Sequence, residues 1–197
     1  MDLLHRFLSG ASSSTRSRRP EKGGSRCGWV EALAVEGEGL GRSRGGLTSK
    51  IHLAVDGRGL PISILITPGE AGDNPQLLPL LNQLNVRRSG RGRPRKRPDR
   101  VIADKAYSHP STRAALRSRQ IAFTCPERSD QIARRQAKGT AGGRPPDFDR
   151  EIYRHRNVVE RCFARLKQFR DLSTRYAKRL AYWHSELTIA AIILWLR

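Results

Sequence analysis

Alternation of apolar and polar residues marks the first regular element of the chain. Ile51, Leu53 and Val55 alternate with more polar positions, which is the period of a strand with one buried face. An Asp-Gly step follows at 56–57, and a second run rich in β-branched residues covers 62–67. Because Asp-Gly between two such runs is typical of a tight turn, the sequence predicts an antiparallel hairpin.

Helical and strand patterns alternate along the rest of the chain. Pro75 opens a leucine-rich helix that runs to Leu84, and a short apolar strand at 101–103 ends at Asp104. Pro is favoured at the first position of a helix, and Pro110 opens the next one. The remaining expected elements are a strand at 121–124, a long helix at 149–169 and an apolar helix at 182–196. This order predicts the α/β class, with a mixed sheet that starts antiparallel, continues parallel and is flanked by helices.

Three segments lack a sustained hydrophobic period. Residues 1–45 contain a Ser/Arg-rich stretch and a Gly-rich stretch, so we expect an irregular N-terminal segment and a folded domain over 46–197. Residues 126–149 are polar and contain Gly and Pro, which favours a loop or mobile insertion. Between 87 and 100, eight of fourteen residues are basic, and we interpret this stretch as a basic linker.

The charge balance points to the partner. The chain has 38 basic and 18 acidic residues, a net charge of +20, and the excess is spread over its whole length. Such a surplus indicates a polyanionic partner. Of the basic residues, 31 are Arg, whose forked guanidinium suits phosphate and base edges. A genome rich in G and C would explain part of the Arg preference, but not the net charge.

Cysteine spacing and apolar runs exclude other classes of protein. Cys27, Cys125 and Cys162 lie far apart, which excludes a disulfide framework and a zinc ribbon and fits a reducing compartment. The longest apolar run, 187–196, is about half of the ~20 residues that a membrane-spanning helix needs. The sequence therefore predicts a soluble cytoplasmic protein.

The helix expected over Glu151 to Phe169 carries a polar stripe. At about 100° per residue, Tyr153, Arg156, Glu160 and Lys167 fall within an arc of about 60°, opposite the apolar side. One interpretation is a solvated face with an Arg156–Glu160 pair, which is worth only a few tenths of a kcal/mol. The other is a site that presents a lone carboxylate among cations and a phenol.

Asp104 is the second carboxylate of interest. It follows a short buried strand, at the sheet edge where α/β sites form, although a turn or cap role is the common alternative for such an Asp. Together, Asp104 and Glu160 are the kind of carboxylates that a two-metal phosphoryl-transfer site uses, with Mg²⁺ ions ~4 Å apart.

Tyr153-x2-Arg156-x3-Glu160-x6-Lys167 resembles the signature around the catalytic Glu of DDE transposases of bacterial insertion sequences, of the insertion-sequence family five type. Four further segments agree with that family in the same order, namely 41–52, 66–69, 100–107 and 156–163. The resemblance covers roughly Gly41 to Arg197.

The resemblance implies an RNase-H-like fold and DNA transposition, in which a Mg²⁺-dependent enzyme (Mn²⁺ being the alternative ion) cleaves and transfers strands at element ends. By position, Asp104 and Glu160 would be the second and third catalytic metal ligands, and Tyr153, Arg156 and Lys167 would contact DNA. The implied partners are double-stranded DNA carrying terminal inverted repeats and further copies of the chain on that DNA. The implied location is the bacterial cytoplasm, associated with the nucleoid.

The chain departs from the family at the first catalytic Asp. That residue belongs on a strand upstream of the Gly-rich segment, in an Asp-Ser/Thr-x-Val/Ile context. Asp2 is the only Asp upstream of residue 41 and lacks this context, while Asp56 lies in the hairpin turn. We therefore expect a sheet that is incomplete at its first strand and a chain that is a poor transposase or an inactive one. The alternatives are a DNA-binding remnant without catalysis and a nuclease of the same fold.

The basic linker has a second interpretation. Arg91, Arg93, Arg95 and Lys96 lie in an Arg-Gly-Arg-Pro context that resembles the core of an AT-hook, in which an extended Arg-Gly-Arg enters a narrow A·T minor groove. The simpler interpretation, which we favour, is a linker that contacts phosphates without sequence preference.

Overall fold

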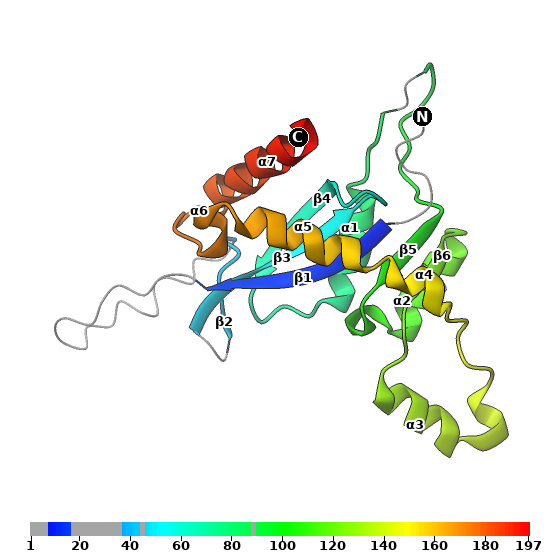
Figure 1. The fold of residues 1–197 in the computed structure, drawn as a ribbon. Helices are drawn as coiled ribbons and strands as arrows, with labels where there is room; N and C mark the ends of the chain where they lie inside the picture. The colour runs from blue at the N-terminus through cyan, green and yellow to red at the C-terminus, as the bar shows by residue number, and fades with distance from the viewer. Residues whose placement is uncertain (1–7, 17–36, 44–45, 88–89) are drawn as a thin grey trace, which may run out of the picture.

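The structure is a computed structural model that describes residues 8–16, 37–43, 46–87 and 90–197. Within these ranges the strands form one six-stranded mixed sheet (Figure 1). Its strands are β1 (Leu8–Arg16), β2 (Gly41–Ser43), β3 (Gly46–Val55), β4 (Pro61–Pro68), β5 (Arg100–Ala103) and β6 (Ala122–Thr124).

The sheet has an antiparallel half and a parallel half. β3 pairs antiparallel with β1 on one side and with β4 on the other, and its first residues also pair with β2. β5 then runs parallel to β1, and β6 runs parallel to β5. The order β4-β3-β1-β5-β6, with these directions, is the RNase-H-like sheet, so the expected fold class is confirmed.

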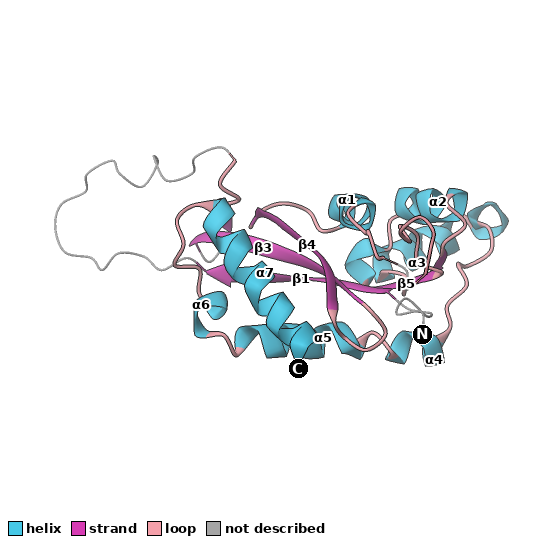
Figure 2. Cartoon of the chain, turned by 90° about the horizontal axis from the view of Figure 1, so that it is seen from above, coloured by secondary structure: helices cyan, strands magenta, loops and turns pink. Residues whose placement is uncertain are grey.

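Helices cover both faces of this sheet (Figure 2). The helical elements are η1 (Asn74–Gln76), α1 (Leu77–Asn82), η2 (Lys105–Tyr107), α2 (Pro110–Ser118), α3 (Ser129–Ala137), η3 (Gly139–Gly142), α4 (Arg150–Arg154), α5 (Asn157–Lys167), α6 (Arg170–Ser173) and α7 (Leu180–Leu196). One core lies between the sheet and α5 and α7 and contains Leu53 and Trp183. The other lies under α1 and α2 and contains Leu77 and Val101. Successive side chains of β3 point to opposite faces of the sheet, so this strand contributes to both cores.

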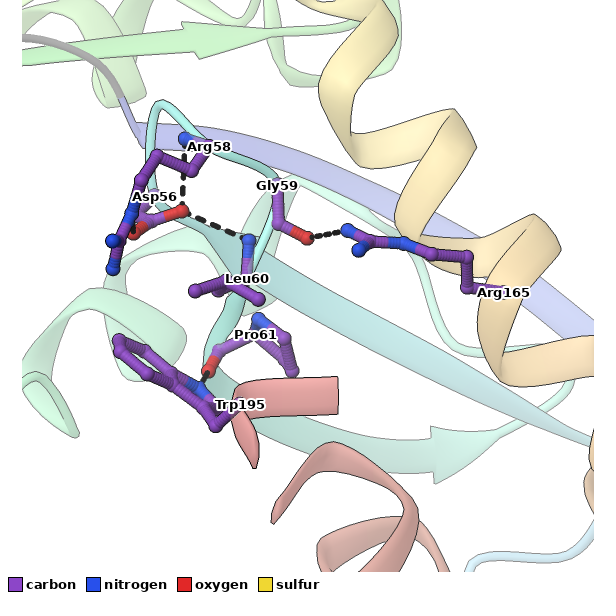
Figure 3. A network of polar contacts seen from close by, with 7 residues as sticks. All are labelled: Asp56, Arg58, Gly59, Leu60, Pro61, Arg165 and Trp195. Atoms are coloured by element: carbon purple, nitrogen blue, oxygen red, sulfur yellow. Dashed lines mark hydrogen bonds and ion pairs between the residues drawn. The ribbon is translucent and has the colours of Figure 1, made fainter. Parts of the chain in front are cut away.

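The predicted hairpin is confirmed, and its turn is tied to two helices (Figure 3). Asp56 is buried and accepts hydrogen bonds from the backbone N–H groups of Arg58 and Leu60 at 2.9 and 2.8 Å. Arg165 of α5 donates to the carbonyl of Gly59, and Trp195 of α7 donates to the carbonyl of Pro61. Asp56 is therefore a structural residue of the turn, as its position in the sequence indicated.

Gly59 has a backbone requirement in this turn. Its φ is +81°, in the left-handed region, and a Cβ there would meet the carbonyl oxygen of Val158 at 3.2 Å. Any other residue would be strained and would push α5 away from the turn.

Three expectations need correction. Residues 8–16 and 41–43 are strands, so the expected irregular segment 1–45 is wrong at these positions, and the sheet has its first strand. Residues 37–40 of that segment form a turn, bends and irregular backbone, as expected, and residues 1–7, 17–36 and 44–45 lie outside the described residues. The expected insertion 126–149 contains α3 and η3 rather than a loop alone. Asp130 is favourable in the first turn of α3, and Ala133, Arg134, Arg135 and Gln136 after it are good helix formers.

The third correction concerns the long helix expected over 149–169. It divides into α4 and α5, with turns at His155 and Arg156. The amide of Val158 bonds to the carbonyl of His155 three residues back, and the amide of Val159 bonds to that of Arg156. This tightening to three-residue spacing interrupts the helix at the polar residues between Tyr153 and Glu160.

The last helix is apolar on more than its buried side. Trp183 and Leu187 are buried, whereas Tyr182, Ile189 and Leu196 are exposed. Part of the apolar surface of α7 is therefore uncovered. Among the described residues, no helix has both the length and the apolar content to cross a membrane.

Burial holds His52 of β3 in its neutral form. Its Nε2 lies 2.8 Å from the hydroxyl of Thr67, its Nδ1 lies 3.5 Å from that of Tyr107, and the side chain is fully buried. Burial lowers the pKa of His52 to about 4, although the carboxylate of Asp73 opposes this shift and Lys50 adds to it. In the unfolded chain the same imidazole titrates near its ordinary value of 6.5.

Stability should therefore fall with acidification between pH 6.5 and pH 4. In that window the unfolded chain binds a proton that the folded chain excludes, so the contribution is complete above the unfolded pKa and is lost as pH falls. The loss attributable to His52 is up to about 3 kcal/mol, at 1.36 kcal/mol per unit of pKa difference. Urea unfolding at several pH values should show a flatter dependence in His52→Gln. An unchanged slope in that variant would contradict the assignment to His52.

Candidate active site

Asp104 lies at the carboxyl end of β5, the strand between β1 and β6. Its backbone is still extended, with φ −69° and ψ 161°, and its side chain accepts a hydrogen bond from the Lys105 amide at 2.6 Å, which caps η2. The capping role that is common for such an Asp is therefore present. The carboxylate is nonetheless 41% exposed, so it remains accessible beyond the cap.

The chain after α3 returns across the same edge of the sheet as α4 and α5. Val159, Cys162 and Leu166 are buried against the sheet, and this fixes the rotation of α5. Glu160 is therefore on the outward side of the first turn of α5, 55% exposed. The predicted separation of an apolar and a polar side on this helix is confirmed.

Arg156 joins the two carboxylates. Its Nη2 lies 2.6 Å from Glu160 Oε1 and its Nη1 lies 3.9 Å from Asp104 Oδ2. The arginine is only 21% exposed, so its contacts with both acids are partly shielded from water. Asp104 and Glu160, which are far apart in the sequence, thus face one shared guanidinium.

Tyr153 completes this group of side chains. The Arg156 guanidinium lies 5.7 Å from the centre of its ring, and the ring of Phe148 is tilted by 58° against it with ring centres 5.2 Å apart. Burial raises the pKa of the Tyr153 phenol; Arg156 opposes this shift, and Asp104 and Glu160 add to it. The phenol therefore stays protonated at neutral pH and can donate a hydrogen bond at this site.

The other predicted DNA-contacting residues lie farther away. Lys167 is exposed at the end of α5, seven residues or about 10 Å along the helix from Glu160. The segment with Arg91, Arg93, Arg95 and Lys96 precedes β5, whereas Asp104 follows it. The length of β5, about 13 Å at 3.3 Å per residue, therefore separates the basic segment from the carboxylates.

The residues present do not fit a complete metal centre. Asp104 and Glu160 offer the hard oxygen donors that Mg²⁺ and Mn²⁺ prefer. However, in the parts of the chain that the structure describes, no three His, Cys, Asp or Glu side chains come together in a way that could hold a metal ion. Among the residues that the structure describes, the cationic group that pairs with both carboxylates is the guanidinium of Arg156.

Two contacts at the site were not anticipated from the sequence. The pattern predicted the Arg156–Glu160 pair but not the approach of Arg156 to Asp104, because that approach depends on how α5 packs on the sheet. The Sγ of Cys125, just after β6, donates to the carbonyl of Asp104 at 3.1 Å. Burial raises the pKa of this thiol to about 12, so Cys125 supports the backbone of Asp104 as a neutral donor.

Comparison with known proteins gives a family and two informative relatives. The sequence model described as "Transposase DDE domain" matches residues 14–196. A protein of Burkholderia cepacia, described as a transposase for insertion sequence element IS402, is 35% identical over 66% of this chain and 54% of its own length. One of Brucella ovis, described as a transposase for element IS6501, is 32% identical over 77% of this chain and its entire own length.

Solved structures give weaker likenesses. The Mos1 mariner paired-end complex with Mn aligns with 82% of this chain and 55% of its own, at 17% identity and a TM-score of 0.36. The Mos1 strand transfer complex aligns with 98% of this chain and 53% of its own, at 13% identity and a TM-score of 0.39. Both scores are too low to carry an argument about the site. The chain spans about half the length of the IS402 relative and of the Mos1 proteins.

Proposed function

Because the chain belongs to the transposase DDE domain family, we propose that it acts in DNA transposition, at the ends of a bacterial insertion sequence. The observation that carries the proposal is the convergence of Asp104 and Glu160 on Arg156, beside the central strands of the sheet. Carboxylates at that edge are the type of ligand that holds the metal ions used in phosphoryl transfer on DNA. The matched range 14–196 contains every one of these residues.

The family indicates use of a divalent metal ion, and we propose Mg²⁺, with Mn²⁺ as the alternative. Asp104 and Glu160 are the proposed catalytic metal ligands. Tyr153, Arg156 and Lys167 are the proposed contacts to DNA near the reacting phosphate, since a neutral phenol, a guanidinium and an ammonium all donate hydrogen bonds to phosphate oxygens. Because the described residues bring only these two acids together, this chain alone is expected to catalyse cleavage and strand transfer poorly.

Double-stranded DNA with terminal inverted repeats is the proposed partner. The net charge of +20 supports it, as does the exposed basic segment with Arg91, Arg93 and Lys96. Assembly of several copies on DNA is also proposed. The exposed apolar residues of α7, among them Tyr182 and Ile189, support contacts between copies.

A DNA-binding transposase domain without catalysis is the second candidate function. It is favoured by the sequence of β1, Leu8 to Arg16, which contains no Asp or Glu although it lies next to β5 in the sheet. Such a chain would occupy element ends without cutting them.

DNA binding and nicking by the purified chain test the proposal. We expect the chain to bind a duplex carrying the ends of its element, and to nick a supercoiled plasmid with those ends weakly in Mg²⁺ or Mn²⁺. Any nicking should disappear in Asp104→Asn and Glu160→Gln, whereas Glu151→Gln, on the exposed surface of α4, should leave it unchanged.

The outcomes separate the two candidates. Binding with no nicking above that of the two variants would favour the non-catalytic domain. No binding to any duplex DNA at about 50 mM salt would contradict both functions. Vigorous nicking by the unaltered chain would overturn the expectation of impaired catalysis.

A further inference from the structure

We infer that residue 11, on β1, is the place of a third acidic group, which the site lacks among the described residues, and that Arg156 is the cation between the two carboxylates in place of a metal ion. A carboxylate at this single position would convert the site into one that binds a divalent cation. The inference rests on the proposed function in one respect, that the site is built for such a cation. Its test uses no DNA and no activity, so it can fail while the DNA binding proposed above still holds.

The register of the sheet identifies the position. β1 pairs parallel with β5, with Leu8 beside Val101, Ser9 beside Ile102 and Gly10 beside Ala103. The next step of the same register places Ala11 beside Asp104. Neighbouring strands lie about 4.8 Å apart, and residues that pair across a sheet lie on the same face.

The pairing with β3 fixes which face this is. Ala11 pairs with Leu53, and Leu53 is fully buried in the core that contains Val159 and Cys162 of α5. Because alternate residues of a strand share a face, position 11 is on the face that α5 covers. Position 11 is therefore beside Asp104 on the face that α5 covers. Glu160, on the solvent side of the first turn of that helix, is connected to Asp104 through Arg156.

The charges of the site explain its present state. Two carboxylates and one guanidinium leave a net charge of −1, and both acids already have a cationic partner in Arg156. A divalent ion would have to displace the Arg156 guanidinium from both carboxylates, and it would gain only two protein ligands in return. A third carboxylate would change the net charge of the site from −1 to −2 and would supply another hard oxygen donor. Both changes favour binding of a divalent cation.

Manganese binding by Ala11→Asp tests the inference. Electron paramagnetic resonance of free Mn²⁺, titrated with protein, measures the dissociation constant directly. We expect Ala11→Asp to bind Mn²⁺ at least about tenfold tighter than the unaltered chain, a change of about 1.4 kcal/mol. The gain should disappear when Glu160→Gln is added.

Two matched variants control for charge and for size. Ser13→Asp adds the same charge two residues along β1, about 8 Å from Asp104 rather than about 5 Å, and should give no gain. Ala11→Asn adds nearly the same side chain without the charge and should bind no better than the unaltered chain. Equal gains in Ser13→Asp and Ala11→Asp would contradict the inference, because the effect would then be one of overall charge.

The remaining outcomes are also decisive. If Ala11→Asp folds only in the presence of Mn²⁺, as followed by circular dichroism, the inference is supported, since the ion then compensates the added charge. If it stays unfolded with and without Mn²⁺, position 11 has no room for a ligand beside Asp104 and the inference fails. It also fails if the unaltered chain already binds Mn²⁺ as tightly, with loss of binding in Asp104→Asn.

Discussion

Replacing Arg175 with methionine is expected to lower the free energy of unfolding by about 4 kcal/mol. Arg175 is only 2% exposed, yet its guanidinium donates to the carbonyls of Glu38, Gly39, Ala177 and Lys178 and to the hydroxyl of Ser49. It also stacks on Trp183, 5.0 Å from the ring centre. Burial lowers the pKa of this guanidinium, and Glu38 and Glu186 oppose the shift.

The size of the effect follows from the groups that the substitution would leave behind. A buried acceptor without a donor costs about 1–3 kcal/mol, and several of the acceptors around Arg175 are carbonyls of the chain itself. Methionine fills much of the same volume, so a cavity contributes little. The loss therefore measures the hydrogen bonds that hold residues 38–39 against the segment before α7.

Urea unfolding of Arg175→Met beside Arg179→Met would measure this loss. Arg179 is exposed and four residues away, so its replacement should change stability by no more than about 0.5 kcal/mol. Arg175→Lys should recover part of the loss, because an ammonium can donate three hydrogen bonds in place of five. A loss below about 1 kcal/mol in Arg175→Met would show that water replaces the guanidinium at these acceptors.

The sequence predicted the elements in which hydrophobic residues follow one clear period. Ile51, Leu53 and Val55 identified β3, and the apolar side of the helix around Glu160 identified the face of α5 that packs on the sheet. The strand at 101–103 and the helix after Pro110 were confirmed in the same way. These signals belong to the local sequence, so they could be recognised without the rest of the fold, although the structure buries β3 and β5 on both faces.

The elements that the sequence did not predict depend on neighbours for their structure. β1 consists largely of small polar residues between Ser9 and Thr15, a composition typical of a loop. It is a strand because β3 and β5 hydrogen-bond to it on both sides. Tertiary context of this kind routinely overrides strand propensity.

The candidate site could be predicted in its members and not in its geometry. The spacing from Tyr153 to Glu160 predicted a shared polar side, and the end of a buried strand indicated Asp104. The contact between Arg156 and Asp104 arises from the way α5 crosses β5, which no local pattern records. The break at His155 and Arg156 likewise interrupts a helix that the hydrophobic period alone would continue.

Neutralising the basic segment is expected to weaken binding to duplex DNA about a thousandfold at 0.1 M salt. The segment is held in place by mutual backbone hydrogen bonds between Val86 and Arg95, and Arg97 donates to the carbonyl of Arg119 at its base. It lines a cavity of about 530 Å³ with Arg93, Pro94, Arg95, Lys96, Arg97 and Asp99. Four cations around one hollow are suited to a chain of phosphates.

The expected magnitude comes from counterion release. Each phosphate contact contributes about 0.9 to the steepness of the fall of log K with log salt concentration. Relative to about 1 M salt, one contact therefore raises the affinity at about 0.1 M salt roughly eightfold. Changing Arg91, Arg93, Arg95 and Lys96 to serine should therefore lower that slope by about 3 to 4. Arg97 stays unaltered, because its contact at the base holds the segment in place.

Fluorescence anisotropy across a salt series measures both the affinity and the slope. The matched control changes Arg170, Lys178, Arg179 and Arg197, four exposed cations of the C-terminal part, so the net charge falls equally. We expect the control to lower the slope by less than 1, because these side chains are not proposed DNA contacts. Equal losses in both variants would mean that overall charge, rather than this segment, binds DNA.

The same titration distinguishes a phosphate-binding linker from a minor-groove hook. A linker contacts phosphates alone, so its contribution to binding should be equal on A·T-rich and G·C-rich duplexes and insensitive to a small-molecule minor-groove ligand. A hook inserts arginine into the narrow groove of A·T tracts. The hook interpretation predicts that such a ligand lowers the affinity of the unaltered chain for A·T-rich DNA but does not lower that of the serine variant. This result would assign Arg91 and Arg93 to the groove. We expect the linker behaviour, because contacts between cations and phosphates need no particular groove shape.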